Sequence, residues 1–321
     1  RFAADVGVRA GVIARVGSLE GASAAREIDA AGCIVAPGFI DAHTHDDRML
    51  LSGADMRAKV SQGVTTVVAG NCGISLAPFP GGMRGAVTPP LDLLDDEGGW
   101  FRFERFGDYV EALRRAPPAT NAALLVGHTT LRVATMEDVE RPAGAREIAA
   151  MRELAREALS AGAIGVSTGL YYEPAAAAPT EEIIEVCRPL RDVDGLYCTH
   201  MRNEADKVMD ALDESFAIGR ALGVGVVISH HKVNGTANHG RSVATLGFIA
   251  EKMKEQAIAL DAYPYSAAST ILSADRAAFA TRTLVTWSKP HPQFAGMDLA
   301  EVARKMSLPQ AEAVARLLPA G

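Results

Sequence analysis

The sequence predicts an α/β fold in which parallel strands alternate with helices, as in a (β/α)8 TIM-like barrel. From Cys33 onward, short apolar runs alternate with helical patterns. The last four strand candidates lie 31, 30 and 33 residues apart, close to the roughly 31 residues per unit of a barrel of about 250 residues. The run Gly225–Ser229 is mostly apolar and bounded by glycine, as is typical of strands buried on both faces of a parallel sheet.

Residues 1–36 are expected to form short strands outside the barrel. Asp5–Arg9 alternates polar and apolar residues, Ala10-Gly11 predicts a turn, and Val12–Gly17 predicts the returning strand. A hairpin this short cannot bury a core alone. We therefore assign it to part of a larger domain.

The barrel strands follow in order, with helices between them. The seven strand candidates are centred near Ile40, Val67, Leu125, Val166, Tyr197, Val227 and Leu260. Apolar stripes at helical spacing predict two of the helices, one from Ile148, Met151, Ala155, Ala158 and Leu159 and one from Val208, Leu212 and Phe216. No eighth strand is evident, because residues 270–321 have the pattern of a loop followed by helix. We expect a fragment that stops before strand eight.

Composition excludes several classes of protein. The 321 residues carry a formal net charge of −7, which argues against a general nucleic-acid binder. Hydrophobic residues make up 48% of the chain, too many for a disordered protein. No apolar run reaches the roughly 18–20 residues of a membrane-spanning helix. Four cysteines in so long a chain favour a reducing, cytoplasmic location over a disulfide framework.

The strongest chemical signal lies at the end of the first barrel strand, where His43 and His45 occur two residues apart. Side chains alternate along a strand, so both imidazoles point to the same side. The active sites of such barrels lie at the C-terminal ends of the strands. A chance His-x-His in a loop is the plain alternative.

Other candidate metal ligands also follow strands. Cys72 follows the second strand, His200 ends the fifth, and His230 follows the sixth. Thiolate and imidazole together suit Zn²⁺. The remaining cysteines, Cys33, Cys187 and Cys198, are interpreted as small hydrophobic residues.

With these motifs identified, the sequence resembles the D-aminoacylase (N-acyl-D-amino-acid deacylase) family of the amidohydrolase superfamily. The resemblance runs over nearly the whole chain, and its Asn-Cys-Gly and Ser-His-His-Lys segments are specific to this branch. The matching segments are 35–47 (VAPGFIDAHTHDD), 63–75 (GVTTVVAGNCGIS), 199–204 (THMRNE), 228–232 (ISHHK) and 260–265 (LDAYPY).

The resemblance implies a barrel over residues 37–321, truncated before strand eight, with 270–321 as part of a lid-like insertion. Residues 1–36 would belong to a small β-sandwich domain. By the same resemblance, Cys72, His200 and His230 would hold a tightly bound zinc, and His43 and His45 would form half of a second, weaker site. The family's general base, an Asp on strand eight, would lie beyond this sequence. Asp261 is the alternative within it.

Three further residues are candidates for binding substrate. Lys232 follows His230 and could pair with the carboxylate of an N-acyl amino acid, with a solvated loop lysine as the alternative. By resemblance, Tyr172 and Tyr263 lie at the rim. His128 is expected to orient a neighbouring group, and Glu204 to cap a helix or to support a ligand.

The resemblance implies zinc-dependent hydrolysis of N-acyl-D-amino acids, with a small molecule as the partner and neither nucleic acid nor membrane. Two alternatives stay open. A cyclic-amide hydrolase of the hydantoinase or dihydroorotase type would need a bridging lysine, and a barrel without catalysis would bind zinc as a scaffold. The sequence does not indicate the preferred amino acid, the acyl group or the oligomeric state.

Overall fold

The structure, a computed structural model, describes residues 2–83 and 85–318. The chain divides into two compact units, Arg1–Pro37 and Gly38–Gly321. No helix among the described residues is long and apolar enough to span a bilayer.

The smaller unit contains the predicted hairpin. Strands β1 (Asp5–Arg9) and β2 (Val12–Gly17) pair antiparallel, as expected. Their turn places Ala10 and Gly11 at φ angles of 51° and 78°, the left-handed region used by tight hairpin turns. The hairpin buries little of its own surface, since Val8 and Ile13 are 65% and 64% exposed.

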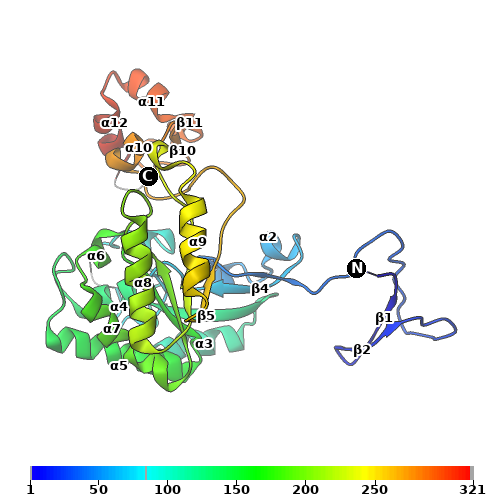
Figure 1. Cartoon of the computed structure of the whole chain (residues 1–321). Helices are drawn as coiled ribbons and strands as arrows, with labels where there is room; N and C mark the ends of the chain where they lie inside the picture. The colour runs from blue at the N-terminus through cyan, green and yellow to red at the C-terminus, as the bar shows by residue number, and fades with distance from the viewer. Residues whose placement is uncertain (1, 84, 319–321) are drawn as a thin grey trace. The chain divides into compact units, whose positions relative to one another are not determined.

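The larger unit is built on one sheet of seven parallel strands in sequence order, curled into a half-barrel (Figure 1). All seven predicted strand centres lie within these strands. Its edges are β3 and β9, and no other strand of the described residues pairs with either. The incomplete barrel predicted from the sequence is therefore confirmed. The strands are β3 (Phe39–Asp41), β4 (Val64–Ala69), β5 (Asn121–Gly127), β6 (Gly165–Gly169), β7 (Leu196–His200), β8 (Val226–Ile228) and β9 (Ile258–Leu260).

Helices follow the strands and pack on the sheet. Both predicted stripes lie on helices, and their residues are buried or packed against the core. The longer helices are α3 (Phe106–Arg115), α4 (His128–Thr135), α5 (Ala145–Ala161), α7 (Thr180–Cys187), α8 (Val208–Leu222) and α9 (Ser242–Lys252). Single turns fill the loops between them: α1 (Met49–Ser52), α2 (Arg57–Val60), η1 (Leu91–Leu93), α6 (Glu173–Ala176), η2 (Arg188–Asp192) and η3 (Thr236–Asn238).

The segment after β9 contains more structure than the expected loop and helix. It has a core of its own, formed by Val285, Leu299, Val302, Ala303, Ala313, Val314 and Leu317. Strands β10 (Leu284–Val285) and β11 (Met297–Asp298) pair antiparallel, and two-residue strands are too short to show a periodic pattern. The other elements are α10 (Ala274–Phe279), η4 (Pro292–Phe294), α11 (Leu299–Met306) and α12 (Gln310–Leu317). Residues 319–321 of the predicted insertion lie outside the described residues.

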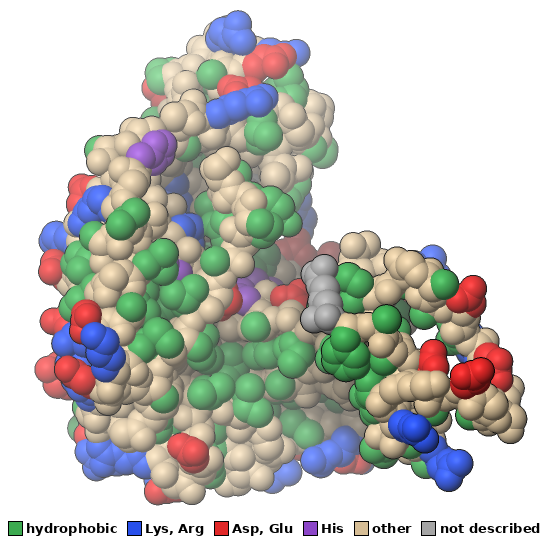
Figure 2. All heavy atoms as spheres, turned by 45° about the vertical axis from the view of Figure 1, so that its right-hand side comes forward, with side chains coloured by type: hydrophobic (Ala, Val, Ile, Leu, Met, Phe, Trp, Pro, Cys, Tyr) green, Lys and Arg blue, Asp and Glu red, His purple; other side chains and the backbone are tan. Residues whose placement is uncertain are grey.

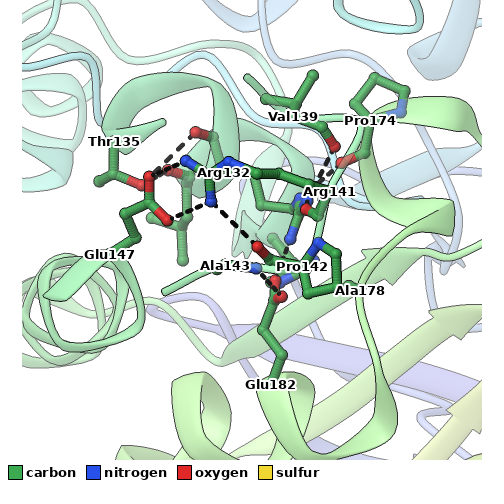
Figure 3. A network of polar contacts seen from close by, with 12 residues as sticks. Arg132, Thr135, Val139, Arg141, Pro142, Ala143, Glu147, Pro174, Ala178 and Glu182 are labelled. Atoms are coloured by element: carbon green, nitrogen blue, oxygen red, sulfur yellow. Dashed lines mark hydrogen bonds and ion pairs between the residues drawn. The ribbon is translucent and has the colours of Figure 1, made fainter. Parts of the chain in front are cut away.

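A buried ion pair holds the loops around α4 and α7 (Figure 3). Arg132 and Glu182 are 0% and 1% exposed and pair with each other. The Arg132 guanidinium also donates to the carbonyls of Pro174, Val139 and Arg141 at 2.6, 2.9 and 2.6 Å. This network ties the chain after α4 to the start of α6 and to α7.

Candidate metal centre

The predicted ligands gather at the C-terminal edge of the sheet because their strands are parallel. The backbone ladder continues past the strand ends: Ser229 N–H donates to the Thr199 carbonyl at 3.0 Å, and Asp261 N–H to the Ile228 carbonyl at 3.1 Å. These bonds fix the register of the loops that carry the ligands. Histidine and acidic side chains are visible inside a hollow of this unit (Figure 2).

Two histidines face one cysteine. The Nε2 atoms of His43 and His230 lie 3.2 and 3.4 Å from Cys72 Sγ. Candidate ligand atoms of these three residues all lie within 4.8 Å of one another. The arrangement brings together residues from the ends of β3, β4 and β8, which are far apart in the sequence.

A second group lies on the other side of His230. His200, Glu204 and His230 also have ligand atoms within 4.8 Å of one another. His200 Nε2 is 3.7 Å from Glu204 Oε2, and the His200 and His230 rings are 4.3 Å apart at their centroids. His230 is therefore shared by the two groups. Glu204 lies beside both histidines of this group, a place that suits the supporting role suggested by the sequence.

His45 is set apart from both groups. Its ring centroid lies 5.6 Å from that of His43, and its Nδ1 is buried without a hydrogen-bond partner among the described residues. The set Cys72, His200 and His230 remains a prediction, because the structure groups Cys72 with His43 and His200 with Glu204.

The Asn-Cys-Gly segment shows why those residue types follow β4. The Asn71 side-chain amide donates to the Val68 carbonyl at 2.9 Å and closes the end of the strand. Cys72 and Gly73 both have positive φ angles, 52° and 80°. A Cβ on Gly73 would lie 2.6 Å from the Gly169 nitrogen, so only glycine fits there.

Two of the predicted ligands have strained backbone conformations. Cys72 and His230 adopt φ angles of 52° and 37°, a region that non-glycine residues seldom occupy. Such conformations persist where the surrounding structure enforces them, and they cluster at functional sites.

Two carboxylates support the histidines that face Cys72. Asp261 Oδ2 lies 3.2 Å from His43 Nδ1, and Asp261 Oδ1 accepts the His230 backbone N–H at 2.7 Å. Glu204 Oε1 lies 3.0 Å from His230 Nδ1. Each ring thus has a carboxylate at Nδ1 and presents Nε2 to the sulfur, an arrangement common around metal ligands.

Burial shapes the charges of the centre. Desolvation, with the charges of His43 and His230, lowers the pKa of His45 to about 3, and burial lowers that of His200 well below its usual value. Burial and the charges of Glu204 and Asp261 raise the pKa of the Cys72 thiol. For Glu204, burial would raise the pKa, but the bond to His230 and the charges of His200 and Lys232 hold it at about 2.

These residues fit a zinc ion. Both ring nitrogens of His200 are buried and lack a hydrogen-bond partner among the described residues, although buried polar atoms are normally paired. Neutral imidazoles have lone pairs available for a metal. A bound cation would also offset the cost of ionising the buried Cys72 thiol.

Aromatic and basic side chains line the rim. The rings of Tyr171 and Tyr172 lie 5.1 and 4.9 Å from that of His200, and Tyr171 stacks on it. Arg276 Nε donates to the Tyr171 hydroxyl at 3.2 Å. Neither Tyr171 nor Arg276 is among the residues predicted from the sequence. Tyr171 adjoins the predicted Tyr172, whereas no local pattern marks Arg276.

Lys232 lies inside the centre, 2.8 Å from a Glu204 oxygen. Its Nζ is also 5.6 Å from the Tyr263 ring centroid, so two predicted substrate contacts lie together. His128 is fully buried and its Nε2 lies 3.4 Å from Glu182, which associates it with the buried ion pair.

Comparison with known proteins identifies the family. The model described as "Amidohydrolase family" matches residues 26–223. D-aminoacylase and N-acyl-D-aspartate deacylase of Alcaligenes xylosoxydans xylosoxydans are 57% and 52% identical to the chain over 318 residues, 99% of its length. The chain spans 65% and 63% of the length of these curated relatives.

A solved structure supports the same family. N-acyl-D-glutamate deacylase from Bordetella bronchiseptica, complexed with zinc and a phosphonate inhibitor, superposes with a TM-score of 0.92 at 44% identity. The match covers 99% of this chain and 66% of that one. The resemblance drawn from the five sequence motifs is confirmed, and the chain belongs to the amidohydrolase family.

Proposed function

We propose that the chain carries the metal centre of a zinc-dependent deacylase, which hydrolyses N-acyl-D-amino acids to a D-amino acid and a carboxylate. The observation that carries this proposal is the pair of imidazoles, His43 and His230, whose Nε2 atoms face the Cys72 sulfur. The named relatives support the D configuration and the N-acyl substrate. The zinc complex of the deacylase from Bordetella supports the metal.

In this proposal Cys72, His200 and His230 hold the tightly bound zinc, and His43 and His45 face it from a weaker second site. Zinc at this place would polarise the amide carbonyl and lower the pKa of a water. Neutral imidazoles at His200 and His45 suit these roles because burial lowers the pKa of both.

The remaining predicted site residues orient a histidine or contact the substrate. Asp261 is a poor general base here, because Oδ1 already accepts the His230 N–H and Oδ2 faces His43 Nδ1. We assign it the orientation of His43. Tyr172 and Tyr263 contact the substrate from the rim, and Lys232, which lies inside the centre, pairs with the substrate carboxylate. We also propose a cytoplasmic location, supported by four cysteines that are all thiols.

The test is hydrolysis of N-acetyl-D- and N-acetyl-L-methionine, -aspartate and -glutamate by the full-length protein, with zinc content measured on the same samples. We expect turnover of D substrates only, and loss of turnover when a chelator removes the zinc. Hydrolysis of dihydrouracil or hydantoin in place of the N-acyl amino acids would identify a cyclic-amide hydrolase. Bound zinc without hydrolysis of any substrate would identify a scaffold.

A further inference from the structure

The two nitrogens of the His230 ring have different surroundings. Nε2 faces Cys72 Sγ at 3.4 Å. Nδ1 has two close neighbours, Glu204 Oε1 at 3.0 Å and Lys232 Nζ at 2.9 Å. Both neighbours are within hydrogen-bonding distance of Nδ1, but each can bond to a different tautomer of the ring.

A neutral imidazole carries one proton, on either Nδ1 or Nε2. A lysine ammonium has only donors, so Lys232 can bond to Nδ1 only where Nδ1 lacks a hydrogen, and the proton then lies on Nε2. An ionised glutamate has only acceptors, so Glu204 bonds to Nδ1–H and leaves the Nε2 lone pair free. Only the tautomer that Glu204 favours can bind a metal through Nε2.

Burial and hydrogen bonds fix the Glu204 side chain beside His230. Its side chain is 3% exposed. Oε2 accepts from the Asn234 side-chain amide at 3.2 Å, and the Glu204 carbonyl accepts the Asn234 N–H at 2.6 Å. The carboxylate also accepts from Lys232 Nζ at 2.8 Å, so the ammonium has an acceptor other than Nδ1.

We propose that Glu204 is a positioning residue: it holds His230 in the Nδ1–H tautomer, with Nε2 open toward Cys72, against the opposite preference of Lys232. The inference rests on the proposed function only in expecting a metal at Nε2. The tautomer itself is a property of the metal-free chain, which allows the two ideas to be tested separately.

The first measurement is the tautomer of His230 in the zinc-free chain, by NMR of protein labelled with ¹⁵N-histidine, with the resonance assigned through His230→Gln. We expect the Nδ1–H form in the wild type and a shift to Nε2–H in Glu204→Gln, where Lys232 has lost its carboxylate. Persistence of the Nδ1–H form in Glu204→Gln would overturn the inference.

The second measurement is zinc affinity, by competition with a chromophoric chelator. Glu204→Gln should weaken binding about 10–100-fold, the usual effect of losing the hydrogen-bond partner of a ligating histidine. Lys232→Met alone should bind zinc at least as tightly as the wild type, because it removes the donor that opposes the Nδ1–H tautomer. The double variant should recover part of the loss, because the glutamine oxygen can then accept from Nδ1–H without competition from the Lys232 ammonium.

A merely structural role for Glu204 makes a different prediction, since removing Lys232 as well could then only add damage. No recovery in the double variant would overturn the inference. Glu214→Gln is the matched control, because it removes a half-buried carboxylate that pairs with Arg202 outside the centre and should leave zinc affinity unchanged. A wild-type chain that binds no zinc would contradict the proposed function, while the NMR result would still decide the role of Glu204.

Discussion

The metal centre and the Arg132–Glu182 network are both buried charged clusters, yet they differ in how completely their polar atoms are satisfied. In the network, the guanidinium of Arg132 bonds to Glu182 and to three carbonyls, and Glu182 Oε2 accepts the Ala143 N–H at 2.8 Å. In the metal centre, both ring nitrogens of His200 and Nδ1 of His45 lack a partner among the described residues.

The contrast separates a structural cluster from one arranged to bind a ligand. An unpaired buried polar atom lowers the stability of the fold. Several such atoms beside a thiol therefore indicate a site that binds a metal. His128, next to Glu182, is the exception, since its nitrogens also lack a well-formed hydrogen bond. It is a single ring, whereas the metal centre brings three imidazoles and a sulfur together.

The largest expected effect comes from Cys72→Ala, because this sulfur is the atom that His43 and His230 share. We expect the variant to lose zinc on dialysis and to lose hydrolysis with it, an effect larger than the about 10–100-fold typical of groups that only support a ligand. Zinc content and turnover are measured together. The matched control is Cys198→Ala, which removes another buried cysteine. Full activity of Cys72→Ala without metal would contradict the proposed mechanism.

The next effect is on stability. Glu182→Gln leaves the buried Arg132 guanidinium without its counter-charge, and breaking a buried pair in this way costs about 3–5 kcal/mol in the free energy of unfolding. Urea denaturation measures it. Zinc affinity should be unchanged, because Glu182 belongs to the network. A large loss of zinc affinity with little loss of stability would reverse the assignment of the two clusters.

The same pair makes stability depend on acid pH. Burial would raise the pKa of Glu182, but its contact with the His128 ring and its hydrogen bonds to the Ala143 N–H and Arg132 lower it to about 2. A carboxylate with a lowered pKa in the folded state stabilises it above the unfolded pKa of about 4.3. That contribution is lost as pH falls from there toward 2. In Glu182→Gln, the unfolding free energy should therefore fall less steeply over this range.

The sequence predicted the strands because strands depend on local patterns, and it predicted that the candidate ligands would meet because each of them follows a strand. Apolar runs placed all seven barrel strands, the last four of them at regular spacing, and the parallel topology then brought His43, Cys72, His200 and His230 to one edge. Two-residue strands such as β10 carry no such pattern. Val285 of β10 packs in a core formed mainly by side chains of α11 and α12, so this strand depends on tertiary contacts that a local pattern does not show.

The supporting groups could not be predicted for a different reason. Asp261 and His43 are 218 residues apart in the sequence and meet only in the folded chain. The roles of Glu204 and Arg276 depend likewise on where a side chain points after folding. The expected ligand set itself came from the family resemblance, since spacing alone does not say which histidines share a metal.

Asp261→Asn tests the His43 half of the centre and should have a smaller effect than Glu182→Gln. Asparagine has one acceptor oxygen, so either His43 Nδ1–H or the His230 N–H loses its partner. We expect zinc affinity to fall about 10–100-fold. The fall should lie toward the lower end of that range, because no lysine of the described residues competes for His43 Nδ1 as Lys232 does for His230 Nδ1. Chelator competition measures it, and wild-type affinity would show that the carboxylate does not orient His43.

The smallest effect is expected at the exposed edge of the Arg132 network, where Arg141 forms a two-bond ion pair with Glu147 at 2.7 and 2.8 Å (Figure 3). The pair resembles Arg132–Glu182 in chemistry but lies in solvent, where water and salt screen the charges and exposed pairs contribute little. Glu147 also accepts the Gly144 N–H at 2.7 Å at the start of α5, a bond that glutamine can keep. Glu147→Gln should therefore lower the midpoint of urea unfolding by a small fraction of the loss in Glu182→Gln. Molar salt should remove even that difference. A loss as large as that of Glu182→Gln would mean that burial is not what separates the two pairs.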